Sequence, residues 1–166
     1  MMKKMGHTQR IAKPLLFLSA FALCFIAAGV GSFFTFAAIP TWYTGLTKPL
    51  FTPPNWLFGP VWTVLYSCMA VSLYLSWTST KRVQQRRKGE LYFYLQLMCN
   101  TLWSIIFFGM RNPAAALGVI VALWLLIFFT IREFIRINRV TVFLLTPYLL
   151  WVSFAAVLNL FIVLLN

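Results

Sequence analysis

The fold is decided by the stretch LLFLSAFALCFIAAGVGSFFTFAAI, which runs from Leu15 to Ile39 without a charged residue. A helix needs about 20 apolar residues to cross the roughly 30 Å of hydrocarbon in a bilayer, and this stretch is long enough. Hydrophobic residues make up 61% of the chain and only 10% is charged, which is not the composition of a water-soluble domain. The sequence therefore predicts an integral membrane protein.

Four further apolar segments follow, each free of charge apart from its flanks. Together with the first they give five predicted spans, over residues 15–39, 55–79, 91–110, 113–132 and 140–165. We interpret residues 1–166 as one all-α membrane domain, a five-helix bundle preceded by a basic tail over residues 1–14. Residues 81–88 are expected to form a basic, solvated loop, and Arg111-Asn112-Pro113 predicts a tight turn between the third and fourth spans.

Positive charge falls almost entirely on one side of such a bundle. Twelve of the fourteen Lys and Arg residues lie in the tail and in residues 81–88 and 132–139, which share one side if there are five spans. Only Lys48 and Arg111 lie on the other side. The positive-inside rule predicts a cytoplasmic N-terminus and an outer C-terminus, as in a bacterial-type plasma membrane. The basic residues are then expected to face anionic lipid headgroups, and no nucleic acid partner is expected.

The beginning of the chain also has features of a signal peptide, with basic residues, an apolar run and then FAA at residues 36–38. A secretory core is about 7 to 15 apolar residues long, and this run is longer, so we interpret it as a retained span. The three cysteines, Cys24, Cys68 and Cys99, fall inside spans with no CxxC spacing and no clustered His. No metal site is expected.

The connection between the first two spans, residues 39–55, differs from a flexible linker. It reads IPTWYTGLTKPLFTPPN and combines four prolines with Trp42, Tyr43 and Phe51. Flexible linkers are rich in Gly and Ser, whereas prolines stiffen a chain and aromatic rings give it surface for packing. We predict a structured cap over the outer end of the bundle. The alternative is an aromatic belt at headgroup depth.

Polar residues of the third span share one helix face. Gln96, Asn100 and Ser104 follow one another at i, i+4 and i+8, and Trp103 lies beside them. Polar groups at membrane depth usually face the protein interior, because unpaired polar groups are costly in lipid. This face of the third span is therefore predicted to point into the bundle.

Two other spans carry aromatic residues in helical register. Trp62 and Tyr66 are four residues apart in the second span, and Pro147, Trp151 and Ala155 follow at i, i+4 and i+8 in the fifth. Each set lies on one face of its helix. These residues are candidates for the walls of a site inside the bundle.

The indole rings of Trp62 and Trp103 are predicted to lie at similar depths below the outer surface. A rise of about 1.5 Å per residue places Trp62 roughly 9 Å and Trp103 about 10 Å below the outer surface, with Trp151 deeper. With Asn100 as a polar contact, they are predicted to wall an apolar pocket that opens outward and suits a flat hydrophobic ligand. The alternative is that these indoles face lipid or fill the core.

Ionisable residues are missing from the interior of every predicted span. The only acids, Glu90 and Glu133, lie at span edges. Ion-coupled transporters normally need ionisable groups inside the membrane, and hydrolysis needs a His or a carboxylate as a base. A driven pump and a hydrolase are therefore both disfavoured.

Three long motifs resemble the TspO/MBR family, which contains the tryptophan-rich sensory proteins of bacteria and the mitochondrial translocator protein. They are WYTGLTKPLFTPPNWLFGPVWTVLY (42–66), LQLMCNTLWSIIFFGM (95–110) and PYLLWVSFAAVLN (147–159). The resemblance covers the chain from the first span onward and implies a five-helix bundle, commonly a homodimer. It also implies a cavity beneath the 39–55 connection that binds porphyrins and haem-related tetrapyrroles, as ligands rather than cofactors, and isoquinoline or benzodiazepine-type drugs.

The resemblance also assigns roles by position. Four residues of the 39–55 connection look like lid residues: Trp42, Tyr43, Pro53 and Pro54. Four residues look like cavity walls: Trp62, Asn100, Trp103 and Trp151. Tyr66, Pro147 and Ala155 complete the predicted ligand-binding set through their helical register. Trp62 and Trp151 are similar to a pair implicated in light-dependent porphyrin breakdown in some bacterial relatives.

Three functions stay open: a binding or sensory module, a photo-oxidative enzyme acting through Trp62 and Trp151, and a passive carrier of hydrophobic ligands. Binding is favoured because it needs only the pocket, whereas catalysis also needs a reactive ring at the ligand edge and a supply of oxygen. Animal members have a cholesterol-recognition segment, with a Tyr followed by a basic residue, late in the fifth helix. Residues 157–166 contain neither, so sterol binding by that route is not expected.

Overall fold

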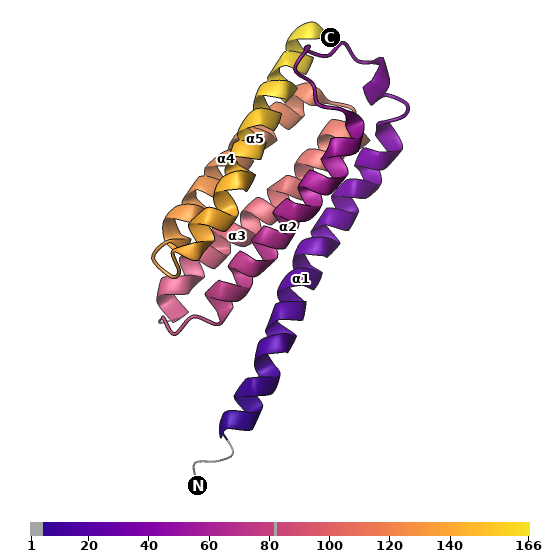
Figure 1. The fold of residues 1–166 in the computed structure, drawn as a ribbon. Coiled ribbons are helices and arrows are strands. Elements are labelled where there is room, and N and C mark those ends of the chain that lie inside the picture. Colours follow the sequence, from indigo (N-terminus) through magenta and orange to yellow (C-terminus); the bar gives the residue numbers. More distant parts are fainter. Residues whose placement is uncertain (1–4, 82) are drawn as a thin grey trace.

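The computed structural model describes residues 5–81 and 83–166, which form five long helices (Figure 1). The helices are α1 (Met5–Ala38), α2 (Asn55–Trp77), α3 (Val83–Ser104), α4 (Pro113–Phe134) and α5 (Val140–Leu165). A 3-10 turn, η1 (Tyr43–Gly45), lies between α1 and α2, and a π-helical segment, η2 (Ile105–Gly109), continues α3. The described residues contain no strand, so the predicted all-α bundle is confirmed.

The five helices close into a ring whose spatial order differs from the chain order. α1 packs on α2 and α3, α2 packs on α5, and α4 lies between α3 and α5. Each helix contains a stretch long and apolar enough to cross a membrane. Residues 39–54, called loop 1 below, lie with the C-terminus at one end of the bundle, and the α2–α3 and α4–α5 connections lie at the other end (Figure 1).

Two helices begin before the predicted spans. α1 begins at Met5 rather than near residue 15, and α3 begins at Val83 rather than near residue 91. The expected loop over residues 81–88 is therefore mostly helix. Its Gln, Arg and Lys residues have high helix propensity, and Arg86 donates from Nη1 to the carbonyls of Ser76 and Trp77 at the end of α2, both at 2.8 Å.

The tight turn predicted between the third and fourth spans is confirmed. Arg111 has a φ of 52°, in the left-handed region, and Pro113 is the first residue of α4. Asn112 caps α4, because its Oδ1 accepts a hydrogen bond from the backbone N–H of Ala115 at 3.0 Å. A cap of this kind stabilises a helix by about 1 kcal/mol.

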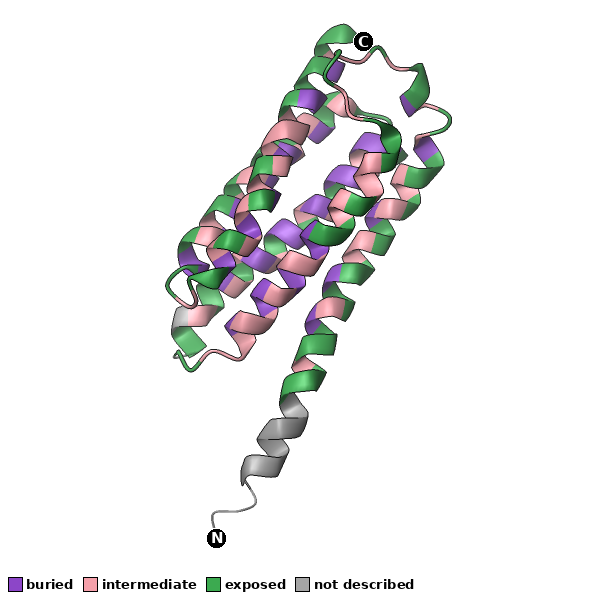
Figure 2. Cartoon of the chain, in the orientation of Figure 1, coloured by how far each residue is buried: buried purple, intermediate pink, exposed green. Residues whose placement is uncertain are grey.

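Buried residues face the neighbouring helices, and apolar residues also cover the outside of the bundle (Figure 2). Phe33 is 72% exposed and Phe143 is 80% exposed. Rings this exposed would be costly in water, but in a bilayer they contact lipid. The outer surface therefore matches the hydrophobic composition of the chain.

Loop 1 is a structured cap, as its prolines and aromatic residues predict. Tyr43 is only 2% exposed and packs on Phe58 of α2 and Phe108 of η2, with ring centroids 6.4 and 5.7 Å apart. The ammonium of Lys48 lies 4.8 Å from the centre of the Tyr43 ring and donates to the carbonyls of Tyr43 and Leu46 at 2.7 and 3.2 Å. A cation–π contact and two charge-assisted hydrogen bonds thus hold the loop in one conformation.

The side chain of Asn166 fastens loop 1 to the end of α5. Its Oδ1 accepts from the backbone N–H of Thr47 and its Nδ2 donates to the Thr47 carbonyl, both at 3.0 Å. This pairing satisfies both backbone groups of a loop residue at once. Two hydrogen bonds of about 1 kcal/mol each oppose opening of the loop at this point.

We expect Asn166→Ala to raise the rate of hydrogen exchange at the Thr47 amide by about tenfold or more, since about 2 kcal/mol of local stabilisation is lost. Hydrogen exchange with mass spectrometry checks this. Asn138→Ala is the control, because Asn138 caps the α4–α5 connection by accepting from Val140 N and lies at the opposite end. An unchanged exchange rate in Asn166→Ala would show that the loop is held elsewhere.

Close contact between α3 and α4 depends on Gly89. A Cβ placed on Gly89 would lie 2.8 Å from Cδ1 of Phe134 and 3.1 Å from Cβ of Glu133. Phe134 cannot move aside easily, since it is fully buried and stacks on Phe93 with an interplanar angle of 7°. Gly29 of α1 provides the contrast, because a Cβ there would meet nothing within 4 Å.

We expect Gly89→Leu to lower the thermal unfolding midpoint, through overpacking that costs about 1–3 kcal/mol. Gly29→Leu is the matched control, a glycine in a helix with open space beside it, and should leave the midpoint unchanged or slightly higher because Leu favours helix. Circular dichroism melts in detergent compare the two. Equal midpoints would mean that α3 and α4 do not need this close approach.

Candidate functional site

A cavity of about 320 Å³ lies between α1, α2 and α3, in the half of the bundle next to loop 1. Four of the predicted site residues line it: Trp62, Tyr66, Asn100 and Trp103. The structure thus places these residues of the second and third spans beside one cavity. The volume is at the small end of the range of about 300–1,000 Å³ that is usual for small-molecule sites.

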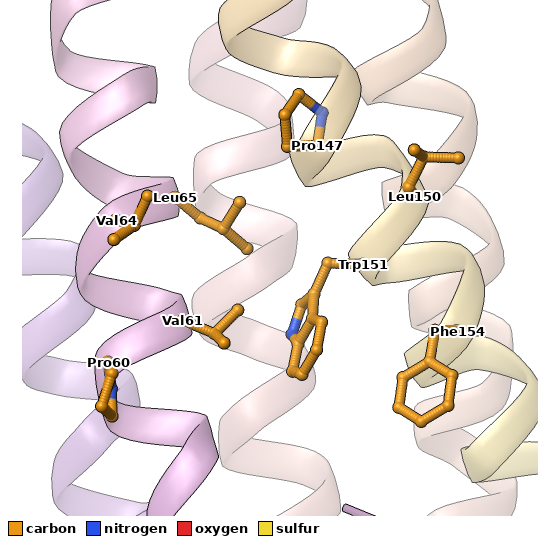
Figure 3. A pocket seen from close by; sticks show the side chains of 8 residues that line it. All are labelled: Pro60, Val61, Val64, Leu65, Pro147, Leu150, Trp151 and Phe154. Carbon is orange, nitrogen blue, oxygen red and sulfur yellow. The ribbon is translucent and has the colours of Figure 1, made fainter.

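Trp151 lies outside this cavity. With Pro147 it lines an open groove of about 570 Å³ between α2 and α5, whose other walls include Val61, Leu65 and Phe154 (Figure 3). The structure therefore places Trp62 and Trp151, predicted to wall one pocket, at two different hollows.

Ala155 and the predicted lid residues line neither hollow. Ala155 is half-buried within α5. Trp42 is half-buried against Phe107, at a centroid distance of 5.7 Å, while Pro53 is half-buried and Pro54 is exposed. Apart from Ile39, its first residue, loop 1 therefore closes the end of the bundle without contributing a wall to the cavity.

Tyr43 makes the link between loop 1 and the cavity. It packs on Phe58 and Phe108, which both line the cavity. Burial raises the pKa of Tyr43 to about 12, so its hydroxyl stays neutral at physiological pH. This buried hydroxyl has no hydrogen-bond partner in the described part of the chain.

The sequence argument missed the contribution of α1. Gly29, Ser32 and Thr35 line the cavity, together with Ser104 at the end of α3. Ser104 Oγ donates to the carbonyl of Gly31 at 2.8 Å and lies 2.8 Å from Thr35 Oγ1. The signal was the run of small residues around Gly29, which lets a neighbouring helix come close but does not indicate a ligand.

A chain of buried hydrogen bonds ties α3 to α5 behind the cavity. Asn100 Nδ2 donates to the hydroxyl of Tyr148 at 2.8 Å, and that hydroxyl donates to Gln96 Oε1 at 2.7 Å. All three side chains are 3% exposed or less. Of their groups, Gln96 Nε2 is buried without a partner among the described residues. This series of hydrogen bonds fixes Asn100 at the edge of the cavity.

A second buried bond fixes Trp103. Its Nε1 donates to Asn159 Oδ1 at 3.1 Å, and Asn159 Nδ2 donates to the carbonyl of Pro113 at 2.8 Å. The Trp103 ring is also held at 5.3 Å from Phe107 and 5.9 Å from Phe108, between centroids. Because the indole N–H is already paired, Trp103 presents ring surface rather than a hydrogen-bond donor to the cavity.

Trp62 is held by aromatic contacts. Its ring centroid lies 5.7 Å from that of Tyr66 and 6.2 Å from that of Tyr148, the second contact being edge-to-face. Such pairs contribute about 0.5–1.5 kcal/mol beyond the area they bury. Trp62 and Trp103 therefore form two preorganised aromatic walls, with Asn100 as a polar group near them.

Charge is absent from the walls of the cavity, among the residues that the structure describes. The two acids serve elsewhere: Glu90 accepts from Ser76 at 2.8 Å, and Glu133 pairs with Lys88 and Arg136 at 3.7 and 3.3 Å. The cavity can thus hold an apolar ring system and satisfy one or two neutral polar atoms. None of its described lining residues is an Asp, Glu, Lys, Arg or His that could act as a counter-ion.

These features define a multi-pass integral membrane protein with an aromatic cavity. A sequence profile of the TspO/MBR family matches residues 20–165. The chain is 46% identical to the tryptophan-rich protein TspO of Archaeoglobus fulgidus over 92% of this chain and 98% of that protein. It is 36% identical to the tryptophan-rich sensory protein of Cereibacter sphaeroides, over 87% of each chain. It is also 36% identical to the human translocator protein, over 78% of each chain.

The chain therefore belongs to the TspO/MBR family, as the three motifs indicate.

We expect Tyr148→Phe to destabilise the protein by about 1–3 kcal/mol, because it leaves two buried amide groups without their shared partner. Tyr74→Phe is the matched control, since the Tyr74 hydroxyl makes no hydrogen bond within the described residues. Thermal unfolding of both variants in the same detergent measures the difference. Loss of equal size in the two variants would show that the α3–α5 hydrogen bonds add nothing specific.

Proposed function

We propose that this protein is a membrane receptor that binds porphyrins, haem-related tetrapyrroles and similarly flat hydrophobic molecules in the cavity between α1, α2 and α3. One observation carries the proposal: Trp62 and Trp103 wall an uncharged cavity that has Asn100 at its edge. Aromatic walls with few polar anchors suit a flat apolar ligand. Isoquinoline and benzodiazepine-type molecules, which the family resemblance implies, have the same character.

The geometry favours binding over photo-oxidation of a ligand. A pair of indoles that act together on one ligand must both reach it, and Trp62 and Trp151 line separate hollows. Phe58 lines the cavity and lies edge-to-face with Trp151 at 6.3 Å, so it stands between the ligand site and the second indole. We therefore propose a receptor rather than an enzyme.

We also propose that the protein lies in a bacterial-type plasma membrane with its N-terminus in the cytoplasm. Exposed basic residues lie in or beside the α2–α3 and α4–α5 connections: Lys81 before α3, Arg87 in the first part of α3, Arg132 in the last turn of α4 and Arg139 before α5. Both connections lie at the end of the bundle opposite loop 1 (Figure 1). The positive-inside rule places that end in the cytoplasm. A homodimer is proposed on the family resemblance, supported by the exposed small residues Ala114 and Gly118 of α4, because small residues let helices approach closely in lipid.

We expect Trp62→Ala to weaken the binding of protoporphyrin IX by about two- to tenfold, because one aromatic wall worth about 0.5–1.5 kcal/mol is removed. Trp103→Phe should weaken it less, since a ring remains. Titration of the purified protein, followed by the Soret absorbance of the porphyrin, measures the affinities.

Trp151→Ala is the matched control, an indole of similar burial at the other hollow. The porphyrin affinity of Trp151→Ala should stay within a factor of about two of that of the unaltered protein, because Trp151 does not line the cavity. Weakened binding in Trp151→Ala with normal binding in Trp62→Ala would move the site to the α2–α5 groove. No saturable binding by the unaltered protein would refute the proposed function.

A further inference from the structure

The cavity is open on one side, between α1 and α2. Of the residues that line it, Phe25 is 39% exposed and Phe36 is 66% exposed, and Gly29 of α1 and Thr63 of α2 are also exposed. Trp103, Ser104 and Asn100 on the α3 side are buried. The lining residues that reach the molecular surface therefore include members of both α1 and α2, along the seam between these two helices.

Glycine creates this opening. A Cβ on Gly29 of α1 or on Gly59 of α2 would meet nothing within 4 Å, and both glycines line the cavity. Nearer the other end of the bundle the same two helices close on each other through aromatic rings. Phe25 lies 6.5 Å from Tyr66, and Phe17 lies 5.4 Å from Tyr74.

The opening lies at the depth of the hydrocarbon. From Phe25 to Phe36 the lining part of α1 extends over about 17 Å, and from Asn55 to Tyr66 that of α2 also extends over about 17 Å, at about 1.5 Å per residue. Both lining stretches begin near the loop 1 end of their helices. Their lengths are comparable with half the thickness of the hydrocarbon core of a bilayer, about 15 Å. The opening therefore faces the acyl chains of the leaflet on the loop 1 side.

The end of the cavity toward water is closed instead. Tyr43 of loop 1 is buried against Phe58 and Phe108, and Lys48 and Asn166 hold the loop in place. No residue between Pro40 and Pro54 lines the cavity. A ligand arriving from water would have to displace this packed cap, whereas a ligand dissolved in the bilayer meets an open seam.

We propose that ligands enter and leave this cavity sideways, from the leaflet on the loop 1 side, through a portal between α1 and α2 formed at Gly29, Gly59 and Thr63. This inference rests on the proposed function and narrows its ligand class to membrane-dissolved amphiphiles. An uncharged cavity at hydrocarbon depth takes the apolar ring system. Any carboxylate of the ligand stays at headgroup depth, near Asn55.

The test measures protoporphyrin IX binding to the full chain in lipid nanodiscs by stopped-flow quenching of tryptophan fluorescence. Gly29→Phe and Thr63→Phe narrow the portal from opposite helices. Val30→Phe is the matched control, because Val30 is the next residue of α1, is 44% exposed and does not line the cavity. Asn166→Ala loosens loop 1 and tests the route from water.

We expect both portal variants to slow association and dissociation by about tenfold, within the one to three decades over which association rates vary among variants of one site. Val30→Phe and Asn166→Ala should stay within a factor of about two of the unaltered protein. Circular dichroism shows whether each portal variant is folded. If one variant misfolds, the rates of the other still test the lateral route.

Unchanged rates in a folded portal variant would overturn the lateral route, and so would faster association in Asn166→Ala alone. In both cases the unaltered protein still binds porphyrin, so the proposed function survives. Failure of the unaltered protein to bind refutes the proposed function instead, and the portal falls with it.

Discussion

The hydrogen bonds between α3 and α5 are the constraint on which the rest of the site depends. A polar side chain inside a bilayer has no water to pair with, so its partner must come from another helix. Asn100 and Gln96 share the Tyr148 hydroxyl, and Trp103 donates to Asn159. These bonds fix the rotation of α3 about its axis. With that rotation fixed, Asn100 and Trp103 also face α1 and α2, where they line the cavity.

The π-helical segment η2 extends this arrangement to the loop 1 end of the bundle. Its hydrogen bond from Met110 N to Ile105 O, at 2.8 Å, spans five residues, which widens the helix by one residue per turn. Phe107 and Phe108 are consecutive, yet both are buried and both contact Tyr43 and Trp103. Loop 1 can therefore pack on two neighbouring rings of η2, of which Phe108 lines the cavity.

The sequence was sufficient to predict the fold because the strongest pattern in it is the alternation of long uncharged runs with charged connections. Five uncharged runs long enough to cross hydrocarbon leave few alternatives to a helix bundle, and the prolines and rings of loop 1 indicate packing. Prediction from the sequence is less complete for the candidate site. The face of Gln96, Asn100 and Ser104 does point inward, but Ser104 bonds to α1 while the other two bond through α5. Helical periodicity gives the face of a residue and not the neighbour it meets.

The same limit explains Trp151. Depth along α5 is readable from the sequence, but the side of α2 on which the indole lies depends on the order of helices around the ring. In the observed order α2 separates α1 from α5, so Trp62 turns toward α1 and α3 while Trp151 faces the α2–α5 seam. The walls from α1 were unpredictable for a related reason, since Gly29 contributes by leaving space rather than by offering a chemical group.

The packing of the other half of the bundle bears on whether such a cavity could carry a ligand across the membrane. Beyond Tyr66 the interior is filled by Met69, Leu73 and Phe93, which have no exposed surface. Protein interiors of this density deform little, and opening a path as wide as a flat ring system would remove several such side chains from contact, at a cost of a few kcal/mol for each. A cavity that ends at a packed core offers no path to the other end of the bundle, and this asymmetry between the two halves supports the proposed receptor over a carrier.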